Sequence, residues 1–389
     1  MRFSNKNKYE FLENKIISQK NRFRLLNSDI NELKKDFVKA NILITGAAGS
    51  IGSKFCEDLV KFNFNSIYLI DKNENQLTEL NRELILICNK KKIKKIRFIC
   101  SDLTTFNIDS FIKINKITHY LNFAAVKHVR SEEELDSIKY MFLTNSVNFL
   151  PSKSYKLKKI FSVSTDKIVN PTSILGITKY LMETNLKNFK IKNKIFVSSA
   201  RFGNVSFSNG SILKYVVDRT IDKKPFGVPN KLRRFFITHK EASSLCFKSL
   251  LKRNNGYVLL PDYKILKQDY LITEIVSKIL KLFNYKGVFV SRIFKNNIIS
   301  GKNYKILLTS PKNHGQKFFE EFYSKEEKLH LDIKDKSVYK VILPTFFKTN
   351  VLVKKIKKFN NTNQLKKYLC KQFKNYKPPK NISKVSKIL

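Results

Sequence analysis

The amino-acid sequence predicts a protein of the α/β class, in which a parallel sheet is covered by helices on both faces. Short apolar runs alternate with helical stretches from residue 41 onward. The runs are apolar almost throughout rather than at every second position, which is typical of strands buried on both faces. Strands that alternate with helices pair in parallel, because a helix carries the chain back between them. We therefore expect a doubly wound parallel sheet.

Six apolar runs are expected to form the strands of this sheet. In chain order they are NILIT, SIYLID, KIRFIC, ITHYLNFAA, KKIFSVST and KIFVSSARF. The helices between them are expected near 50–62, 74–88, 107–115, 132–149 and 174–190. Beyond residue 210 the pattern loosens, and we expect one further helix near 268–284 and short strands near 287–292 and 303–309.

Composition argues against several other classes of protein. The chain of 389 residues has no apolar stretch near 18 residues and no apolar leader, so we expect neither a membrane span nor a secretory signal. Its five cysteines are odd in number and never form a CxxC pair, which favours the reducing cytoplasm over a disulfide framework. The five histidines form no ligand-spaced cluster, so we also expect no catalytic metal.

The formal net charge of +45 raises the question of nucleic-acid binding. Of the 76 basic residues, 12 are arginines, which leaves 64 lysines. Arginine, the residue suited to bidentate contacts with bases, is therefore scarce. We expect a solvated basic surface that helps to attract an anionic substrate, and no specific nucleic-acid binding.

The strongest local motif is a GxxGxxG loop at residues 46–52, between the first expected strand and the helix that follows it. Glycine allows a tight turn and a close approach of the backbone to a pyrophosphate, and the helix N-terminus presents N–H groups to that anion. The loop therefore predicts a dinucleotide-binding sheet of the Rossmann type. The residues expected to contact the cofactor here are Gly46, Ala48, Gly49, Ser50, Ile51 and Gly52.

Residues at the ends of the next three strands support this prediction. Asp71 ends the second strand 19 residues after the last loop glycine, where a carboxylate accepts hydrogen bonds from the adenosine ribose. Asp71 favours NAD as the cofactor. The neighbouring Lys72 can pair with a 2′-phosphate, so NADP is not excluded. The other expected cofactor contacts are Asp102 and Leu103 after the third strand and Ala124 and Ala125 after the fourth.

Further motifs follow in order along the chain. They are NFAAVKHVR at 122–130, SVSTDKIVNP at 162–171, GITK at 176–179, RFGNV at 201–205, SNGS at 208–211 and RRFFIT at 233–238. Together with the glycine loop, they resemble the extended short-chain dehydrogenase/reductases. Within that superfamily they resemble the polysaccharide-biosynthesis nucleotide-sugar dehydratases, the UDP-N-acetylglucosamine 4,6-dehydratase group. The close resemblance covers roughly residues 40–250.

The resemblance and the changes of pattern divide the chain into four segments. We expect a helical N-terminal extension at 1–39, an NAD(P)-binding Rossmann domain at 40–210, a smaller substrate-binding region at 211–315 and a C-terminal extension at 316–389. The last segment is Lys-rich, and the sequence assigns it no role. We expect a homo-oligomer.

The resemblance implies 4,6-dehydration of a UDP-sugar, with UDP-N-acetylglucosamine as the expected substrate. A hydride passes from C4 of the sugar to NAD(P)+, and a base then removes the acidified C5 proton. Water leaves from C6, and the hydride returns to C6. The product is a UDP-4-keto-6-deoxy-hexosamine, a precursor for surface polysaccharide.

Asp166 and Lys167 match the acid and base positions of this family. A base for the C5 proton needs a pKa near neutrality, and a buried lysine beside other cations can be lowered that far. A carboxyl group that its surroundings keep protonated can supply a proton to the C6 hydroxyl. Both residues follow the fifth strand, at the edge where such sheets bind ligands. The resemblance also implies that Thr165 handles the C4 hydroxyl proton.

Lys179 stands at the lysine position of the superfamily's YxxxK pair, which implies contact with the nicotinamide ribose and a catalytic role. Leu175 stands at the tyrosine position and cannot transfer a proton. Long members of the dehydratase family carry Met there, so an apolar residue at this position is compatible with activity. Loss of redox activity is the alternative.

The resemblance also implies where the substrate binds. The segments that hold the UDP moiety in relatives contain an amide, a hydroxyl and an arginine, and arginine can clamp a diphosphate bidentately. Two residues after the fourth strand are expected to border the sugar or the nicotinamide, and the lysine of the two is also an expected cofactor contact. The residues expected to bind substrate are Lys127, His128, Asn204, Ser211 and Arg234.

Several alternatives remain open at this point. A UDP-sugar 4-epimerase shares the C4 oxidation but needs no acid–base pair for C5 and C6, so Asp166 and Lys167 together favour the dehydratase. A non-catalytic NAD-binding or basic scaffold protein is favoured only by Leu175 and the charge. Arg233 competes with Arg234 for the diphosphate.

Overall fold

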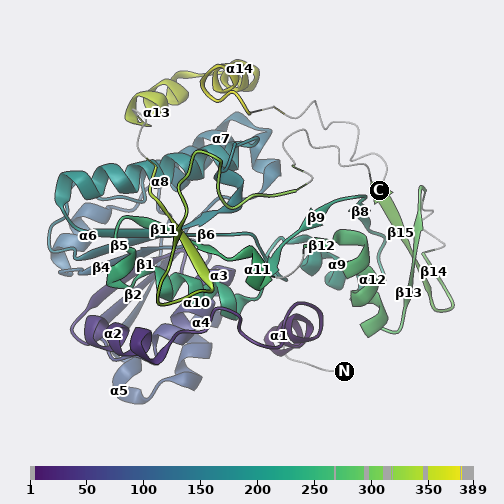
Figure 1. Ribbon diagram of the computed structural model, residues 1–389, viewed down its shortest axis with the longest axis horizontal. Helices are drawn as coiled ribbons and strands as arrows, with labels where there is room; N and C mark the ends of the chain where they lie inside the picture. The colour runs from purple at the N-terminus through teal and green to yellow at the C-terminus, as the bar shows by residue number, and fades with distance from the viewer. Residues whose placement is uncertain are drawn as a thin grey trace.

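Parallel strands form the body of the main sheet in the computed structural model, which describes residues 5–266, 269–292, 298–309, 317, 319–344, 349–376 and 378 (Figure 1). Their order in space is β3 (Ile96–Cys100), β2 (Ser66–Asp71), β1 (Asn41–Thr45), β4 (His119–Asn122), β5 (Lys159–Thr165), β6 (Phe196–Phe202) and β11 (Tyr257–Pro261). The strand order reverses between β1 and β4, and such sheets bind ligands outside the carboxyl ends of the strands at this reversal. The predicted doubly wound parallel sheet is confirmed.

Two antiparallel strands extend the sheet beyond β11. β17 (Val338–Ile342) pairs with β11, and β16 (His330–Leu331) pairs with β17. Val338 and Val341 of β17 are buried in the core of the large lobe. Both strands come from the segment 316–389, for which the sequence predicted only an extension. This part of the C-terminal segment therefore belongs to the main sheet.

Helices cover both faces of the sheet (Figure 1). α3 (Ser50–Leu59), α4 (Glu74–Ile87) and α10 (His239–Ser249) lie on one face, and α7 (Leu135–Phe142) and α8 (Ile174–Asn193) lie on the other. α5 (Lys90–Ile93) and α6 (Ile108–Ile114) flank β3 in the chain. The helix expected near 132–149 is shorter than predicted, because the chain continues from α7 as a π-helical turn over Leu143–Val147.

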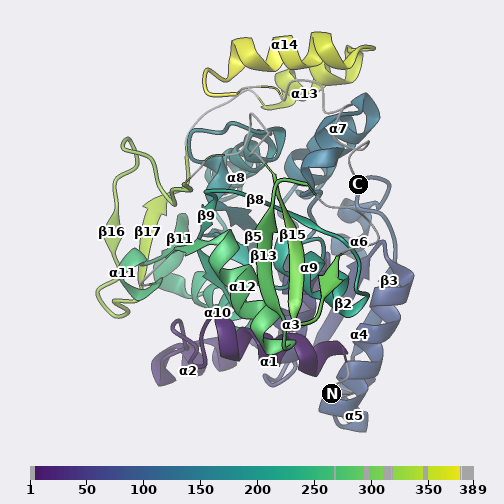
Figure 2. The same ribbon diagram turned by 90° about the vertical axis from the view of Figure 1, so that its right-hand side faces the viewer.

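A smaller lobe lies to one side of the main sheet and faces the viewer in Figure 2. It contains α9 (Ile212–Ile221), α12 (Ile272–Leu282) and a sheet of β8 (Gly227–Pro229), β13 (Lys286–Val290), β14 (Ile299–Ser300) and β15 (Asn303–Thr309). α11 (Tyr263–Leu266) lies between the lobes in Figure 1, and β9 (Arg233–Arg234) and β12 (Tyr270–Leu271) pair at the edge of the small lobe. A further short pair joins β7 (Asn204–Val205) to β10 (Phe236–Ile237). The segment 211–315 supplies most of this lobe, although its α10 and β11 lie in the large one.

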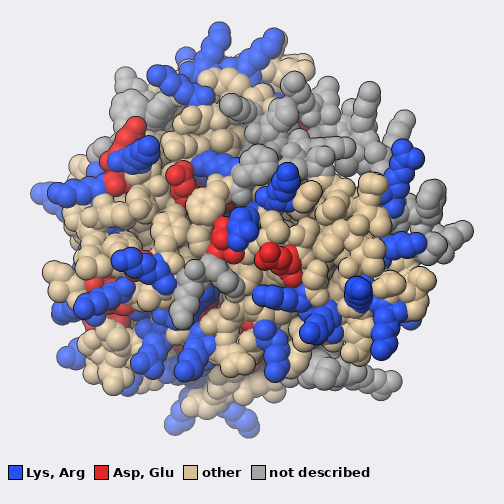
Figure 3. Space-filling view, turned by 45° about the vertical axis from the view of Figure 1, so that its right-hand side comes forward, with Lys and Arg blue, Asp and Glu red and all other residues tan. Residues whose placement is uncertain are grey.

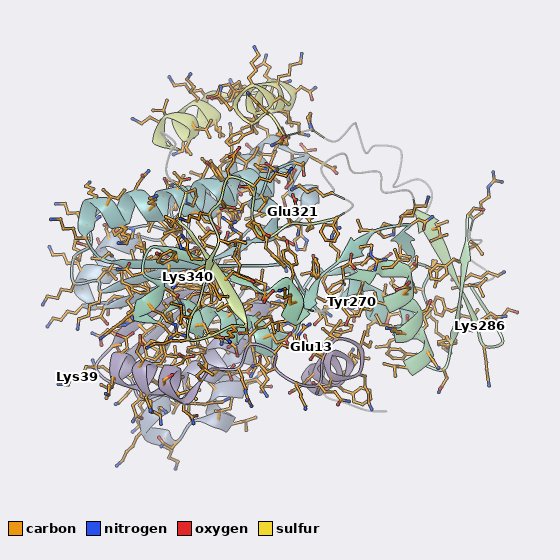
Figure 4. All side chains as sticks on the ribbon, viewed as in Figure 1. Glu13, Lys39, Tyr270, Lys286, Glu321 and Lys340 are labelled. Atoms are coloured by element: carbon orange, nitrogen blue, oxygen red, sulfur yellow. The ribbon has the colours of Figure 1, made fainter. Side chains whose placement is uncertain are left out.

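The N-terminal segment is helical and contacts both lobes. α1 (Asn5–Ile16) buries Leu12 and Ile16 in the core of the small lobe, whereas α2 (Asn27–Phe37) buries Phe37 in the core of the large lobe. Glu13 on α1, labelled in Figure 4, accepts hydrogen bonds from the Ser206 hydroxyl at 2.6 Å and the His239 backbone N–H at 3.1 Å. Residues 5–37 therefore join the two lobes.

Two C-terminal helices cover α7 and α8. α13 (Thr349–Lys358) and α14 (Thr362–Gln372) lie across these helices in Figure 1. Their apolar residues form one buried cluster with those of α7 and α8. The buried members from the C-terminal side are Leu352, Ile356, Leu365, Leu369, Phe373 and Tyr376. The pairing keeps an apolar face of α7 and α8 away from water.

Lys and Arg side chains are spread over much of the face in Figure 3 rather than confined to one element. A few acidic side chains lie among them near the middle of this face. Within the described part of the chain, none of the helices is both long enough and apolar enough to cross a bilayer.

Replacing Ile356 by Ala is expected to lower the free energy of unfolding by about 2–5 kcal/mol, because it leaves a cavity in the cluster beneath α13. Ile356 is 1% exposed. Val351→Ala on the same helix is the matched control, since Val351 is 48% exposed. Urea unfolding of both variants measures the difference. Equal, small losses would contradict the packing of α13 on α7 and α8.

Candidate active site

The carboxyl ends of β1, β2, β4 and β5 bring the predicted site residues to one edge of the main sheet. The glycine loop follows β1, and residues 165–167 follow β5. Parallel pairing of β1 with β4 and of β4 with β5 sets these two segments at the same edge. The fold therefore allows a cofactor held by the loop and a substrate at residues 165–167 to meet.

The glycine loop has the geometry of a cradle for a diphosphate. Gly46 has φ of +69°, and a Cβ there would lie 2.4 Å from the Ala124 backbone nitrogen. A Cβ on Gly52 would lie 2.2 Å from the Gly46 carbonyl oxygen. α3 begins directly after Gly49, and no side chain caps its first turn. The N–H groups at this end of α3 therefore face the loop, where a diphosphate can accept hydrogen bonds.

Asp71 holds the glycine loop from the end of β2. Its Oδ2 accepts a hydrogen bond from the Ala48 N–H at 3.0 Å, and its Oδ1 accepts one from the Asn73 N–H at 3.0 Å. Each carboxylate oxygen can accept a further hydrogen bond. The half-buried carboxylate is thus fixed in place and still has acceptor capacity for ribose hydroxyls.

The other expected cofactor contacts line the same edge with different exposures. Asp102 accepts hydrogen bonds from the Tyr140 hydroxyl at 2.5 Å and the Thr104 N–H at 2.8 Å. Burial raises the pKa of Asp102, but these bonds outweigh it and leave the pKa below its ordinary value. Lys72 donates to the Tyr140 hydroxyl at 3.1 Å.

The remaining expected cofactor contacts differ in exposure. Leu103 is buried in the core, Ser50, Ile51 and Ala124 are half-buried, and Ala125 is exposed.

Residues 165–167 form a compact hydrogen-bonded cluster. The Thr165 hydroxyl donates to Asp166 Oδ1 at 2.8 Å, and the Lys167 ammonium donates to the same oxygen at 2.9 Å. Thr165 ends β5 and caps the short 3₁₀ turn Asp166–Ile168. The Asp166 carboxylate is buried, whereas about a third of the Lys167 side chain, 29%, stays exposed. One carboxylate oxygen therefore links the hydroxyl and the amine.

The charge state of Lys167 differs from our expectation. Burial lowers the pKa of Lys167, but the carboxylates of Asp166 and Glu320 outweigh burial and raise it above the ordinary value. The expected fall of this pKa is wrong in direction, because the two carboxylates outweigh both burial and the nearby Arg234 cation. Lys167 Nζ forms an ion pair with Asp166 Oδ1 at 2.9 Å.

Glu320 is a member of the site that the sequence analysis missed. Its Oε1 lies 3.9 Å from Lys167 Nζ and 3.5 Å from Arg234 Nη2. It belongs to the C-terminal segment, where one glutamate in a mixed stretch carries no recognisable motif. Only the fold brings it to the carboxyl edge.

Lys179 lies beneath this cluster, on α8. Its Nζ donates to the Val163 carbonyl of β5 at 2.9 Å and lies 3.6 Å from Met182 Sδ. Burial lowers the pKa of Lys179 to about 8, although Glu183 partly offsets this. Leu175, one turn earlier, is 8% exposed and packs in the cluster of α7, α8, α13 and α14.

The structure separates the two arginine candidates. Arg233 is exposed and pairs with Asp269 at 2.8 Å. Arg234 is 6% exposed, donates to the Arg233 carbonyl and faces Glu320. Burial lowers the pKa of the Arg234 guanidinium, although Glu320 and Asp166 oppose this. Arg234 therefore lies with the Asp166–Lys167 pair, and Arg233 does not.

The remaining expected substrate contacts surround the cluster less closely. Lys127 is at the exposed rim, where neighbouring protein atoms and the Lys167 charge lower its pKa. The His128 ring packs over Gly210, whose Cβ would lie 2.0 Å from it. Asn204 donates weakly to the Phe235 carbonyl at 3.4 Å, and Ser211 caps α9. Asn204 and Ser211 thus already have structural partners.

A cavity of about 700 Å³ lies beside the glycine loop, between α1, α3 and α4. Ala48 and Ser50 line it at the glycine loop, Glu10 lines it from α1, and Glu83 lines it from α4. It does not include residues 165–167. Among the described residues, no group of three or more His, Cys, Asp and Glu side chains is arranged to hold a metal ion; His314 lies outside them.

Comparison with known proteins identifies the family. The family model described as "Polysaccharide biosynthesis protein" matches residues 42–341. The chain belongs to the polysaccharide biosynthesis protein family. This match covers more than half of the chain and confirms the resemblance found in the sequence.

Relatives in this family include proteins named for two reactions. Capsular polysaccharide biosynthesis protein CapD of Staphylococcus aureus is 27% identical over 76% of this chain and 49% of CapD. UDP-glucose 4-epimerase of Rickettsia bellii is 25% identical over 75% of this chain and 80% of the epimerase. UDP-N-acetylglucosamine 4,6-dehydratase (inverting) of Campylobacter jejuni is 23% identical over 74% of this chain and 83% of the dehydratase. The chain thus spans about half the length of CapD and most of the other two.

Solved structures confirm the fold. Pen from Bacillus thuringiensis has a TM-score of 0.64 at 20% identity and covers 80% of this chain and 90% of its own. DesIV is the dTDP-glucose 4,6-dehydratase of Streptomyces venezuelae, solved with NAD and TYD bound. It has a TM-score of 0.52 at 14% identity and covers 82% of this chain and 96% of its own. The predicted extended form of the Rossmann sheet is confirmed.

Replacing Lys179 by Met is expected to raise the free energy of unfolding at pH 7 by roughly 1–3 kcal/mol, at about 1.36 kcal/mol per unit of pKa change. The buried ammonium is disfavoured in the folded chain, with a pKa near 8 against an ordinary 10.5. Between these pH values the unfolded chain holds more protons, so the unsubstituted protein gains stability as pH rises.

The gain from Lys179→Met should therefore shrink as pH rises from 8 to 10.5. Urea unfolding at both pH values measures it, with Lys192→Met as the control at an exposed position of the same helix. A loss of stability at pH 7 would show that the hydrogen bond to Val163 outweighs the cost of burying the charge.

Proposed function

We propose that the chain is a nucleotide-sugar 4,6-dehydratase that converts UDP-N-acetylglucosamine to a UDP-4-keto-6-deoxy-hexosamine for surface polysaccharide. The observation that carries the proposal is the Asp166–Lys167 pair, joined at 2.9 Å at the carboxyl end of β5. A 4,6-dehydratase needs both an acid and a base beside C5 and C6 of the sugar. Membership of a family that contains dehydratases supports the proposal.

The residues at the glycine loop fit a dinucleotide. A Cβ on Gly46 or Gly52 would collide with backbone, and the loop and the first turn of α3 form an anion cradle closed by Asp71. When bound, NAD supplies the oxidising power that takes a hydride from C4 and later returns it to C6. The carboxylate of Asp71 favours NAD over NADP, since it would repel a 2′-phosphate.

The Asp166–Lys167 pair holds a single proton between its two members. Moving that proton along the 2.9 Å hydrogen bond from Nζ to Oδ1 gives a neutral amine and a neutral carboxylic acid. The amine can then accept the C5 proton, and the carboxylic acid can protonate the departing C6 hydroxyl. The ion pair in the free protein is thus the resting form of an acid–base pair, with no net change in protons.

Other residues hold the reactants in this proposal. Thr165 binds the C4 hydroxyl and passes its proton to solvent, because Asp166 Oδ1, which accepts the Thr165 hydrogen bond, takes the proton of Lys167. When Lys167 later returns a proton to C5, solvent supplies the proton that restores the pair. Arg234 pairs with the substrate diphosphate, and Lys127 at the rim adds positive charge beside the sugar. Lys179 contacts the nicotinamide ribose. Leu175 takes no part in proton transfer, because its side chain is packed among apolar residues.

The surrounding assignments follow from the sequence. The substrate contacts proposed are Lys127, His128, Asn204, Ser211 and Arg234. A cytoplasmic location and a homo-oligomer complete the proposal.

A UDP-sugar 4-epimerase is the second candidate, because UDP-glucose 4-epimerases of Rickettsia align with most of this chain. An epimerase oxidises and reduces C4 alone. It would leave the Asp166–Lys167 pair without a reaction at C5 and C6.

Incubation with UDP-N-acetylglucosamine and NAD in heavy water tests the two candidates. The expected product has lost one water and carries deuterium at C5, as followed by NMR and mass spectrometry. An epimer at C4 with unchanged composition and no deuterium would establish the epimerase. No conversion across a panel of UDP-sugars with either NAD or NADP would reject both.

Replacing Lys167 by Met is expected to lower the rate of C5 proton exchange by about 10²–10⁴-fold, the range for loss of a general base. NAD binding should be unchanged. The rate of deuterium entry at C5 is the measurement, and Lys156→Met at an exposed position is the control. Exchange retained in Lys167→Met would remove the base role.

Replacing Asp71 by Ala is expected to weaken NAD binding by about 10–100-fold, since hydrogen bonds to a charged group contribute about 1.5–3 kcal/mol. NADP binding should fall much less, because the substitution also removes repulsion of a 2′-phosphate. Fluorescence titration with both cofactors measures the ratio. Equal losses would instead assign Asp71 to holding the loop through the Ala48 N–H.

A further inference from the structure

Glu320 enters the candidate active site from a distant part of the chain. It lies in the segment 319–344, beyond the range in which the sequence placed any site residue. Its side chain is 6% exposed, and its Oε1 faces two cations, Arg234 Nη2 at 3.5 Å and Lys167 Nζ at 3.9 Å. Neither distance is that of a tight hydrogen bond, so the carboxylate lies between the cations rather than against one of them.

The second oxygen of Glu320 is buried and has no hydrogen-bond partner among the described residues. A buried carboxylate oxygen without a donor costs free energy, and native proteins keep few such atoms. An oxygen of this kind next to two cations and an acid–base pair indicates a functional position rather than a structural one.

The backbone around Glu320 is held by other contacts. The Phe322 N–H donates to the Tyr263 hydroxyl at 2.7 Å, and the Phe322 carbonyl accepts from Arg201 at 2.9 Å. Phe322 itself is buried in the main core. The segment therefore does not need the Glu320 carboxylate to stay in place, which frees that side chain for another role.

The charged groups around Glu320 come from three elements. Asp166 and Lys167 lie on the turn after β5, Arg234 lies on β9, and Lys317 lies three residues before Glu320 in the chain. Lys127, after β4, is a further cation close enough to Lys167 for the two charges to act on one another. Asp166 also acts on Arg234, and Glu320 is the carboxylate within 4 Å of both Arg234 Nη2 and Lys167 Nζ.

We propose that Glu320 is a positioning residue that holds the Lys167 ammonium and the Arg234 guanidinium at a fixed separation, so that the acid–base pair and the diphosphate-binding cation act on one substrate. This inference rests on the proposed dehydratase function for its catalytic meaning. Its electrostatic part, the effect of Glu320 on Lys167, is independent of the substrate.

The Glu320 carboxylate also affects the pH at which Lys167 loses its proton. Burial lowers the pKa of Lys167, and Glu320 acts with Asp166 to raise it. Removing the negative charge of Glu320 should therefore lower the pKa of Lys167. The acid–base pair is active only while it holds its single proton, so the basic limb of the pH–rate profile should move to lower pH.

Glu320→Gln in the full chain is the decisive variant, because it keeps the shape and removes the charge. Glu321→Gln is the matched control, since Glu321 is adjacent and exposed; Figure 4 shows it on the side of the large lobe toward the small lobe. The first readout is acetylation of Lys167 by acetic anhydride across a pH range, followed by mass spectrometry. It needs no turnover.

The labelling midpoint of Lys167 is expected to fall by about one pH unit in Glu320→Gln, the lower end of the effect of an opposite charge within 4–6 Å. It should stay constant in Glu321→Gln. An unchanged midpoint in Glu320→Gln would overturn the inference. If that variant fails to fold by thermal unfolding, Glu320→Asp replaces it, with a smaller fall expected because the carboxylate is drawn back.

The second readout is the pH profile of C5 deuterium exchange with UDP-N-acetylglucosamine. We expect the basic limb to move with the labelling midpoint, and kcat to fall more than KM rises. A midpoint that falls while the unsubstituted protein shows no exchange would reject the dehydratase and retain the effect of Glu320 on Lys167. A midpoint and a basic limb that both stay constant would reject the positioning role alone.

Discussion

The buried guanidinium of Arg201 is the interaction on which the arrangement of the site depends. Arg201 lies on β6, donates two hydrogen bonds to Glu183 on α8, and two more to Glu327 on the C-terminal segment. Loss of one partner from a buried ion pair costs about 3–5 kcal/mol, because a charge is left without compensation. α8 carries Lys179, and the C-terminal segment carries Glu320. One cation thus fixes both elements against the same strand.

The parts of the site that could be predicted from the sequence are those whose residues are neighbours in the chain. The glycine loop and the run Thr165–Lys167 have local patterns with a chemical reason, and the parallel sheet brings them to one edge. Glu320 could not be found in this way, because nothing near it in the sequence marks it. The direction of the Lys167 pKa shift was predicted wrongly for a different reason. Its largest charged cause, Asp166, is the adjacent residue, and the sequence does not show how close their side chains lie; the second carboxylate, Glu320, comes from a distant part of the chain.

Although the chain has few acidic residues, carboxylates connect its segments to one another. The sequence has 31 acidic residues against 76 basic ones. Glu13 links α1 to Ser206 and His239, and Glu241 on α10 binds Arg22 at 2.7 Å. Both contacts connect the N-terminal segment to the body of the protein. These two carboxylates therefore stabilise contacts between segments, whereas the excess lysines are spread over the surface.

The C-terminal position of Glu320 and β17 has a consequence for how the protein is made. The strands that carry the glycine loop and Thr165 are complete once β6 has been synthesised, and N-terminal parts of large chains fold first. The cofactor-binding half can thus form on the ribosome while the partner of Arg234 and the edge strand of the sheet are still missing. The acid–base environment is therefore complete only after residue 320 has been synthesised. A chain that ends before residue 320 would carry the glycine loop and Thr165 but not the Glu320 carboxylate that faces Lys167.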